Sequence, residues 1–106
     1  MINTGNSSTT MNEENAIIYF WNSSCSVCEP LYDKLKLLVE EQFPNLNLEK
    51  INIIEHPEYR TKYQVFSSPL LILLLDGKEY FRSGGNISVH ELKLKIGRLY
   101  ALKFEN

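Results

Sequence analysis

The sequence lacks the patterns that place a protein in a membrane or on a nucleic acid. Its apolar runs are all far shorter than the roughly 20 residues of a membrane-spanning helix. Lysine and arginine (11) nearly balance aspartate and glutamate (13), the formal net charge is −2, and no basic cluster is present. Residues 1–15 contain no basic segment followed by an apolar core, as a secretory signal would. We therefore expect a cytoplasmic monomer without nucleic-acid or membrane partners.

Cysteine is also scarce, and both cysteines lie in one C-x-x-C unit, Cys25-Ser26-Val27-Cys28. The unit follows an apolar run at 16–21 and opens an amphipathic stretch, which predicts a strand and then a helix. A helix start presents unpaired N–H groups and positive partial charge, which stabilise a thiolate. In the cytoplasm such a pair is typical of catalysis or metal binding rather than of a structural crosslink. Two inert buried thiols are the alternative.

The remaining pattern predicts a single α/β domain, since 106 residues with 43% hydrophobic content suffice for one core. We expect strands at 16–21, 46–53, 70–75 and 78–82, and helices at about 28–42, at 55–63 and from 88 onward. Asp76-Gly77 predicts a hairpin between the last two strands. The order β-α-β-α-β-β-α therefore predicts a mixed four-stranded sheet with helices on both faces.

Residues beyond the cysteine pair match the pattern of a known family. They are Trp21, Cys25, Cys28, Lys50, Asn52, Pro57, Lys62, Tyr63, Val65, Pro69, Gly77 and Gly85. Over about residues 15–103 the chain thus resembles the thioredoxins. The resemblance implies a thioredoxin fold. The chain departs from the family pattern in its shortened N-terminus, and the Asn-, Ser-, Thr- and Gly-rich composition predicts a mobile segment at 1–12 before a thioredoxin-like domain at 13–106. The resemblance also implies a thiol–disulfide oxidoreductase that acts on protein or peptide disulfides and is recycled by a reductase.

The positions of the two thiols suggest different roles. Cys25 precedes the predicted helix, so we expect it to be the exposed nucleophile that forms a mixed disulfide with the substrate. Cys28 lies inside the first turn, so we expect it to be buried and to resolve that intermediate. Ser26 and Val27 replace the Gly-Pro usual in thioredoxins and would favour the thiolate. Glu29 would disfavour it, or would serve as an acid suited to a helix start.

The resemblance also implies a substrate groove beside the cysteines. Pro69 would follow a cis peptide bond, leaving the backbone of Ser68 free to pair with an extended substrate. Trp21 would flank the groove, and Gly84 and Gly85 would allow a substrate backbone to approach closely. The ordinary alternatives are a core aromatic at Trp21, a trans-proline at a strand start and plain loop glycines.

Tyr19 departs from the family pattern, because thioredoxins carry a buried aspartate at that position. The aspartate pairs with a lysine and assists proton transfer at the resolving cysteine. Here Lys50 has the strand parity of an inward-facing residue, so we predict a hydrogen bond between Tyr19 and Lys50. The alternative for Lys50 is that its ammonium snorkels to the sheet end. A phenol is a poor base at neutral pH, so proton transfer would use water or Glu29, or resolution would be slow.

We expect neither a metal nor an organic cofactor, because the two sulfurs carry the electrons. His56 and His90 are the only histidines, and neither lies at short metal-ligand spacing from the cysteines. Two alternatives remain to the oxidoreductase. One is a thioredoxin-fold binding or adaptor module with vestigial chemistry, and the other is metal binding through the C-x-x-C.

Overall fold

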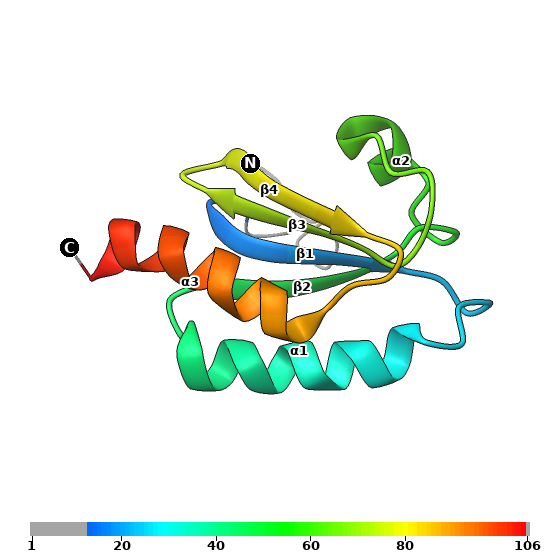
Figure 1. Ribbon diagram of the computed structural model, residues 1–106. Coiled ribbons are helices and arrows are strands. Elements are labelled where there is room, and N and C mark those ends of the chain that lie inside the picture. Colours follow the sequence, from blue (N-terminus) through cyan, green and yellow to red (C-terminus); the bar gives the residue numbers. More distant parts are fainter. Residues whose placement is uncertain (1–12, 106) are drawn as a thin grey trace.

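The computed structural model describes residues 13–105, and these form one α/β layer structure (Figure 1). The elements follow the predicted order: β1 (Asn15–Trp21), α1 (Cys28–Gln42), β2 (Asn47–Asn52), α2 (Glu58–Tyr63), β3 (Leu70–Leu75), β4 (Lys78–Gly84) and α3 (Val89–Phe104). The predicted mobile segment at 1–12, and with it the shortened N-terminus, lies outside the described residues.

The four strands form one mixed sheet in the order β2-β1-β3-β4. β1 pairs in parallel with β2 and antiparallel with β3, and β3 pairs antiparallel with β4. The two central strands are buried along nearly their whole length, from Ala16 to Phe20 and from Leu70 to Leu75. Their continuous apolar sequences follow from this position, since side chains on both faces of a central strand must be covered.

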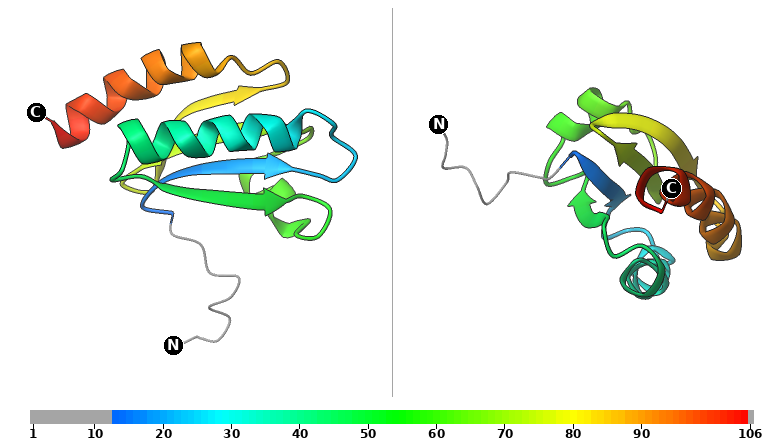
Figure 2. Two further views of the ribbon diagram at one scale, coloured as in Figure 1. Left: turned by 90° about the horizontal axis from the view of Figure 1, so that it is seen from below. Right: turned by 90° about the vertical axis from the view of Figure 1, so that its left-hand side faces the viewer.

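Two apolar clusters lie on opposite faces of the sheet. One joins alternate residues of β1 and β3, such as Ile17 and Leu73, to α1 and α3. The other joins the intervening residues, such as Ile18 and Ile72, to the tyrosines of α2. Figure 2 shows α1 and α3 together on one side of the sheet and α2 on the other. The prediction of a mixed sheet with helices on both faces is confirmed.

The helix and strand boundaries differ from the predicted ones in one informative place. α2 begins at Glu58 rather than at residue 55. The side chain of Asn52 accepts hydrogen bonds from the backbone of Ile54 (2.9 Å) and Glu55 (3.3 Å), which forms a turn directly after β2. This turn delays the helix until after Pro57.

The hairpin and the last helix begin as the sequence predicts. Asp76 and Gly77 both have positive φ (54° and 78°), as the predicted two-residue hairpin turn requires. Ser88 caps α3 by accepting a hydrogen bond from the backbone N–H of Glu91 at 3.3 Å.

Arg82 on β4 ties the sheet to the end of α2. Its guanidinium donates to the carbonyl oxygens of Tyr63 (2.7 Å) and Gln64 (3.1 Å) and holds an ion pair with Glu79 (2.8 Å). This hydrogen bonding to Arg82 lowers the pKa of the Glu79 carboxyl, against the opposing effect of its partial burial. The carbonyls are those that the end of a helix leaves unpaired. Arg82 thereby fixes the point from which the chain enters the loop at 64–69.

We expect Arg82→Met to lower the free energy of unfolding of the oxidised protein by about 1–2 kcal/mol, because two carbonyls lose their charged donor. Urea unfolding measures the change. Glu79→Gln is the matched control, since it removes the ion pair but leaves both carbonyl contacts, and its cost should stay below about 1 kcal/mol. Equal losses in the two variants would contradict the capping role.

Candidate functional site

The two cysteines form a disulfide where the chain passes from β1 to α1. Cys28 is the first residue of α1 and is 1% exposed, while Cys25 in the preceding loop is half-buried. The loop is closed by a hydrogen bond from the Cys25 N–H to the carbonyl of Asn22 at 3.1 Å. The sequence predicted this difference in exposure between the thiols. It leaves one sulfur of the pair open to attack and the other covered.

The start of α1 is suited to a thiolate. Val27 occupies the N-cap position and makes no side-chain hydrogen bond to the first turn. The N–H groups of that turn therefore have no capping side chain, and the helix dipole adds positive partial charge at the same place. Both effects favour the anionic form of a sulfur at this end.

Tyr19 lies under this helix start, fully buried on β1. Its hydroxyl donates to the carbonyl oxygen of Cys28 at 2.9 Å, and its ring lies 5.7 Å from that of Tyr32. Burial, with a smaller contribution from Glu29, raises the pKa of Tyr19 to about 12. The phenol is therefore protonated at neutral pH, and it acts as a fixed donor to the helix backbone.

The predicted hydrogen bond between Tyr19 and Lys50 is wrong. The Lys50 ammonium instead binds Glu29 at 2.6 Å. It also lies over the rings of Trp21 and Tyr32, 4.6 and 4.4 Å from their centroids. The physical reason is that a buried hydroxyl is satisfied by the nearby carbonyl, whereas a cation remains where a carboxylate and water reach it. Lys50 is thus on the predicted face of the sheet, but its charge snorkels to the surface.

Two of the segments expected to form the groove are joined by a hydrogen bond, and Pro69 itself is buried. The Ser68–Pro69 peptide bond is cis, and the Pro69 carbonyl accepts a hydrogen bond from the N–H of Gly85 at 3.1 Å. Gly85 has φ of 71°, and a Cβ there would meet open space. At Gly84, by contrast, a Cβ would lie 2.9 Å from a methyl carbon of Leu70, so the absence of a side chain there serves packing between β3 and β4. Trp21 is half-buried and packs against the cluster under α1.

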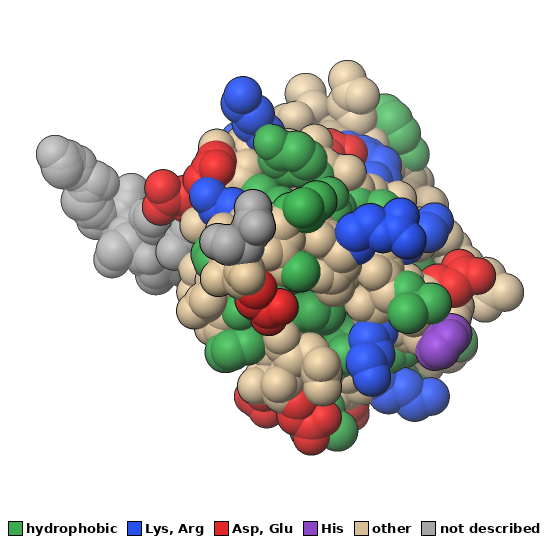
Figure 3. Space-filling model, turned by 60° about the vertical axis from the view of Figure 1, so that its left-hand side comes forward, with side chains coloured by type: hydrophobic (Ala, Val, Ile, Leu, Met, Phe, Trp, Pro, Cys, Tyr) green, Lys and Arg blue, Asp and Glu red, His purple; other side chains and the backbone are tan. Residues whose placement is uncertain are grey.

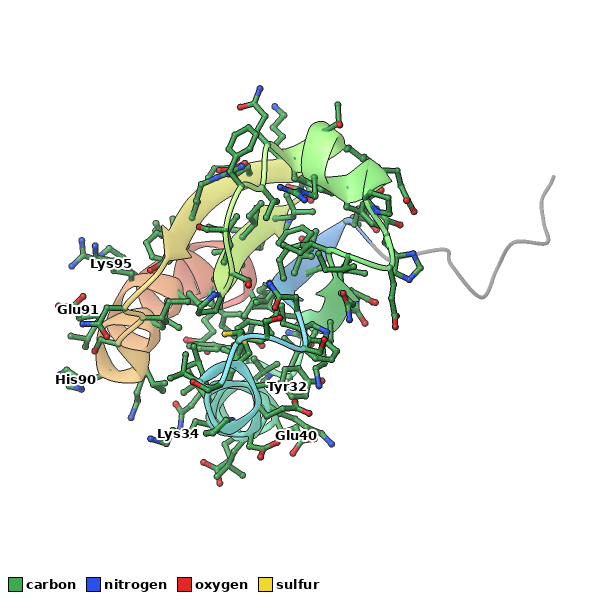
Figure 4. All side chains as sticks on the ribbon, turned by 90° about the vertical axis from the view of Figure 1, so that its right-hand side faces the viewer. Tyr32, Lys34, Glu40, His90, Glu91 and Lys95 are labelled. Carbon is green, nitrogen blue, oxygen red and sulfur yellow. A yellow bond between two sulfur atoms is a disulfide. The ribbon has the colours of Figure 1, made fainter. Side chains whose placement is uncertain are left out.

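The residues expected to adjust the stability of the thiolates lie around the disulfide, with Tyr19 buried, Lys50 half-buried and the others exposed. Ser26, Val27 and Glu29 are exposed, and Figure 4 views this end of the molecule with the helix α1 end-on. The surrounding charge is balanced, because Glu29 is paired with Lys50.

Asn22 is a site residue that the sequence reasoning missed. Its amide nitrogen donates to the hydroxyl oxygen of Ser68 at 2.7 Å, and its amide oxygen accepts from the backbone N–H of Ser24 at 2.7 Å. One side chain thus shapes the cysteine loop and ties it to the loop of Pro69. An asparagine at a strand end, two residues before a serine, is a signal for the turn. No local signal points to the bond with Ser68.

The histidines lie away from the cysteines. His56 is 3.5 Å from the carboxylate of Glu58, and His90 is exposed on α3. Within residues 13–105, no three side chains of the metal-ligating kind (His, Cys, Asp, Glu) gather closely enough to hold a metal ion. None of the helices in this range is long and apolar enough to cross a membrane.

Comparisons with known proteins agree on one family. A family model described as Thioredoxin matches residues 3–98. A thioredoxin-like protein of Bacillus subtilis, YdfQ, is 32% identical over 87 residues, which cover 82% of this chain and 77% of that protein. Thioredoxin of Chlamydia trachomatis is 38% identical over 69 residues, covering 65% and 67% of the two chains.

A solved structure gives the same result in three dimensions. Thioredoxin 1 of Thermosipho africanus superposes with a TM-score of 0.76 at 31% sequence identity, covering 83% of this chain and 97% of that one.

We expect Tyr19→Phe to lower the free energy of unfolding by about 0.5–1.5 kcal/mol at neutral pH, since the Cys28 carbonyl loses the buried hydrogen bond from the Tyr19 hydroxyl and keeps only its bond within α1. The unfolded phenol ionises near pH 10 and the folded one near 12. The unfolded state therefore holds fewer protons above pH 10, and wild type loses stability as pH rises from about 10 to 12. The phenylalanine variant lacks this loss.

Urea unfolding at pH 9 and pH 11 measures both effects. The stability difference between wild type and Tyr19→Phe should shrink at the higher pH. A constant difference would contradict the raised pKa. Tyr80→Phe, at an exposed position on β4, is the control and should show neither effect.

A double-mutant cycle tests the bond between the loops. We expect Asn22→Ala and Ser68→Ala to be coupled by about 1 kcal/mol in unfolding free energy, because either change removes the same hydrogen bond. Asn22→Ala combined with Ser67→Ala is the control pair, since Ser67 is exposed beside the bond. Coupling of similar size in both pairs would show that the Asn22–Ser68 bond is not its source.

Proposed function

Since the chain belongs to the thioredoxin family and is a thiol–disulfide oxidoreductase, we propose that Cys25 is its nucleophile and Cys28 its resolving thiol. The observation that carries the assignment is the difference in burial between the two cysteines at the start of α1. Only a sulfur that a second disulfide reaches can begin the exchange.

The proposed reaction starts from the reduced pair. The Cys25 thiolate attacks one sulfur of a protein or peptide disulfide, forming a mixed disulfide and releasing one substrate thiolate, which takes a proton. The Cys28 thiolate then attacks the sulfur of Cys25, releases the second substrate thiol and leaves the Cys25–Cys28 disulfide. Two electrons pass to the substrate, and a reductase returns two to the protein. The sulfurs carry all of them, so the proposal includes no cofactor.

The residues around Cys25 and Cys28 have separate roles in the proposed reaction. Ser68 and Gly85 form the surface against which an extended substrate lies, and the buried Pro69 holds the Ser68 backbone in place through its cis peptide bond and the hydrogen bond from Gly85. Trp21 is half-buried at the end of β1 and would flank this surface. Tyr19 holds the start of α1 and supplies no base, because its pKa is about 12. Water then carries the proton from Cys28, since the Glu29 carboxylate is held by Lys50.

The use of cysteine in this chain also bears on the cellular compartment in which the reaction takes place. Both cysteines of the chain lie in the exchange pair, so none is left for a structural disulfide. This use of cysteine supports work in the cytoplasm, where reductases keep thiols reduced. We propose that the protein acts there as a monomer on protein substrates, with no nucleic-acid or membrane partner.

A trapping experiment tests the assignment of the two thiols. Cys28→Ser should accumulate a mixed disulfide with a disulfide-containing protein such as insulin, because the nucleophile remains and the resolving thiol is gone. Cys25→Ser should accumulate none. Non-reducing electrophoresis reads both results, and trapping by Cys25→Ser alone would reverse the assignment.

Redox titration across glutathione ratios, followed by the fluorescence of Trp21, is the companion measurement. We expect one reversible two-electron transition in wild type and none in a variant with both Cys25→Ser and Cys28→Ser. Accessible thiols without a transition in wild type would contradict exchange as the function.

A further inference from the structure

A groove of about 420 Å³ adjoins the cysteine pair on the side away from Pro57 and α2. It lies between the start of α1 and the segment that joins β4 to α3. Five apolar side chains line it: Val27, Pro30, Leu31, Ile87 and Val89. A space of this size accommodates a large side chain together with part of its backbone.

The groove is continuous with the exchange site. Val27 stands between the two cysteines, is 57% exposed and forms one wall. Gly85 forms another part of the lining and donates its N–H to the Pro69 carbonyl. A chain that lies along Ser68 and Gly85 with its sulfur at Cys25 therefore reaches the groove within a few residues.

The floor of the groove is formed before any ligand arrives. Leu31, Ile87 and Val89 are half-buried and pack against the cluster between the sheet and α1. Their exposed edges are apolar surface that only a ligand would cover. This favours an apolar side chain as the occupant, because burying that surface releases water from both partners.

The charge of the groove has one sign. Lys34 is its only charged lining residue. In the described part of the chain, Lys34 takes part in no ion pair, as is true of other exposed lysines such as Lys36 and Lys93, but Lys34 is the one that lines this groove. Figure 4 shows Lys34 on α1 and His90 on the first turn of α3. An unneutralised ammonium at the rim favours a carboxylate on the ligand.

The opposite end of the molecule lacks this combination. A smaller cavity there, of about 180 Å³, lies between Leu75, Tyr80, Leu99 and Leu102. Its lysine, Lys103, is already paired with Asp76 at 2.6 Å. Figure 3 shows this end, where apolar, basic and acidic side chains are intermixed. Nothing in that arrangement selects an occupant.

We propose that the groove beside Val27 is a specificity subsite of the exchange reaction, a proposal that rests on the proposed function. Its occupant is a large apolar side chain of the disulfide substrate, next to an acidic residue that pairs with Lys34. The protein thus prefers substrate disulfides whose cysteine lies a few residues from an apolar-acidic pair.

Kinetics on peptide disulfides test this preference. The substrates are disulfide-linked dimers of one short peptide with a single central cysteine, in which a Leu-Glu, Leu-Lys or Gly-Gly pair is moved along the chain in steps of one residue. The second-order rate of reduction by the reduced protein is followed by Trp21 fluorescence. For at least one distance between the pair and the cysteine, counted in residues and called the spacing, we expect the Leu-Glu dimer to react about ten-fold faster than the Gly-Gly dimer. It should also react about three-fold faster than Leu-Lys at low salt.

Charge reversal on α1 locates the effect. Lys34→Glu should reverse the order of the Leu-Glu and Leu-Lys dimers at that spacing. Lys36→Glu is the matched control: it makes the same change of charge on the same helix, but Lys36 lines a separate groove beside Glu40 and should leave the order as in wild type.

The outcomes separate two failures. Equal rates for Leu-Glu and Leu-Lys at every spacing, or equal shifts in the Lys34→Glu and Lys36→Glu variants, would overturn the subsite while leaving the oxidoreductase intact. Failure of wild type to reduce even the Gly-Gly dimer would overturn the exchange function itself, and the subsite with it.

Discussion

Burial of β1 is the constraint on which the rest of the site depends. Residues Ala16 to Phe20 are fully buried, with strands on both sides and apolar clusters on both faces. A strand held in this way leaves the sheet at one defined point, and the loop with the cysteines starts there. The same burial forces the only polar side-chain group among Ala16 to Phe20, the Tyr19 hydroxyl, to find a partner. That partner is the Cys28 carbonyl, so the hydrophobic core directly fixes the start of α1.

The charges near the disulfide are arranged differently from the pattern that the family resemblance implies. The buried position that the resemblance gives to an acid is occupied by Tyr19, whose hydroxyl holds the start of α1. The acid near the cysteines is Glu29, which lies on the surface. The Lys50 ammonium binds the Glu29 carboxylate at the surface and also lies over the rings of Trp21 and Tyr32. Because Glu29 is largely exposed, its electrostatic effect on the sulfurs is screened by water and partly cancelled by Lys50. The helix start therefore dominates the electrostatics of the thiols.

Local patterns in the sequence predicted what local physics controls. The apolar runs gave the central strands, Asp76-Gly77 gave the hairpin, and Ser88 with Glu91 gave the start of α3. The burial difference between the cysteines also followed from their spacing at a helix start. The bonds of Tyr19 to Cys28, Lys50 to Glu29 and Asn22 to Ser68 did not, because the two residues of each pair are at least nine positions apart. A polar side chain with several possible hydrogen-bonding partners binds the one that tertiary packing brings closest. A local sequence pattern does not predict that packing.

The two links between loops, from Asn22 to Ser68 and from Gly85 to Pro69, span long stretches of sequence. The dithiol motif is local, whereas the proposed substrate surface at Ser68 and Gly85 exists only when the strands β3 and β4 are in place. Partial opening of that side would leave a competent thiol pair without a recognition surface. Such an intermediate would still exchange disulfides but would no longer choose among them. Because β4 is an edge strand of the sheet, its local opening is the change that would produce this state.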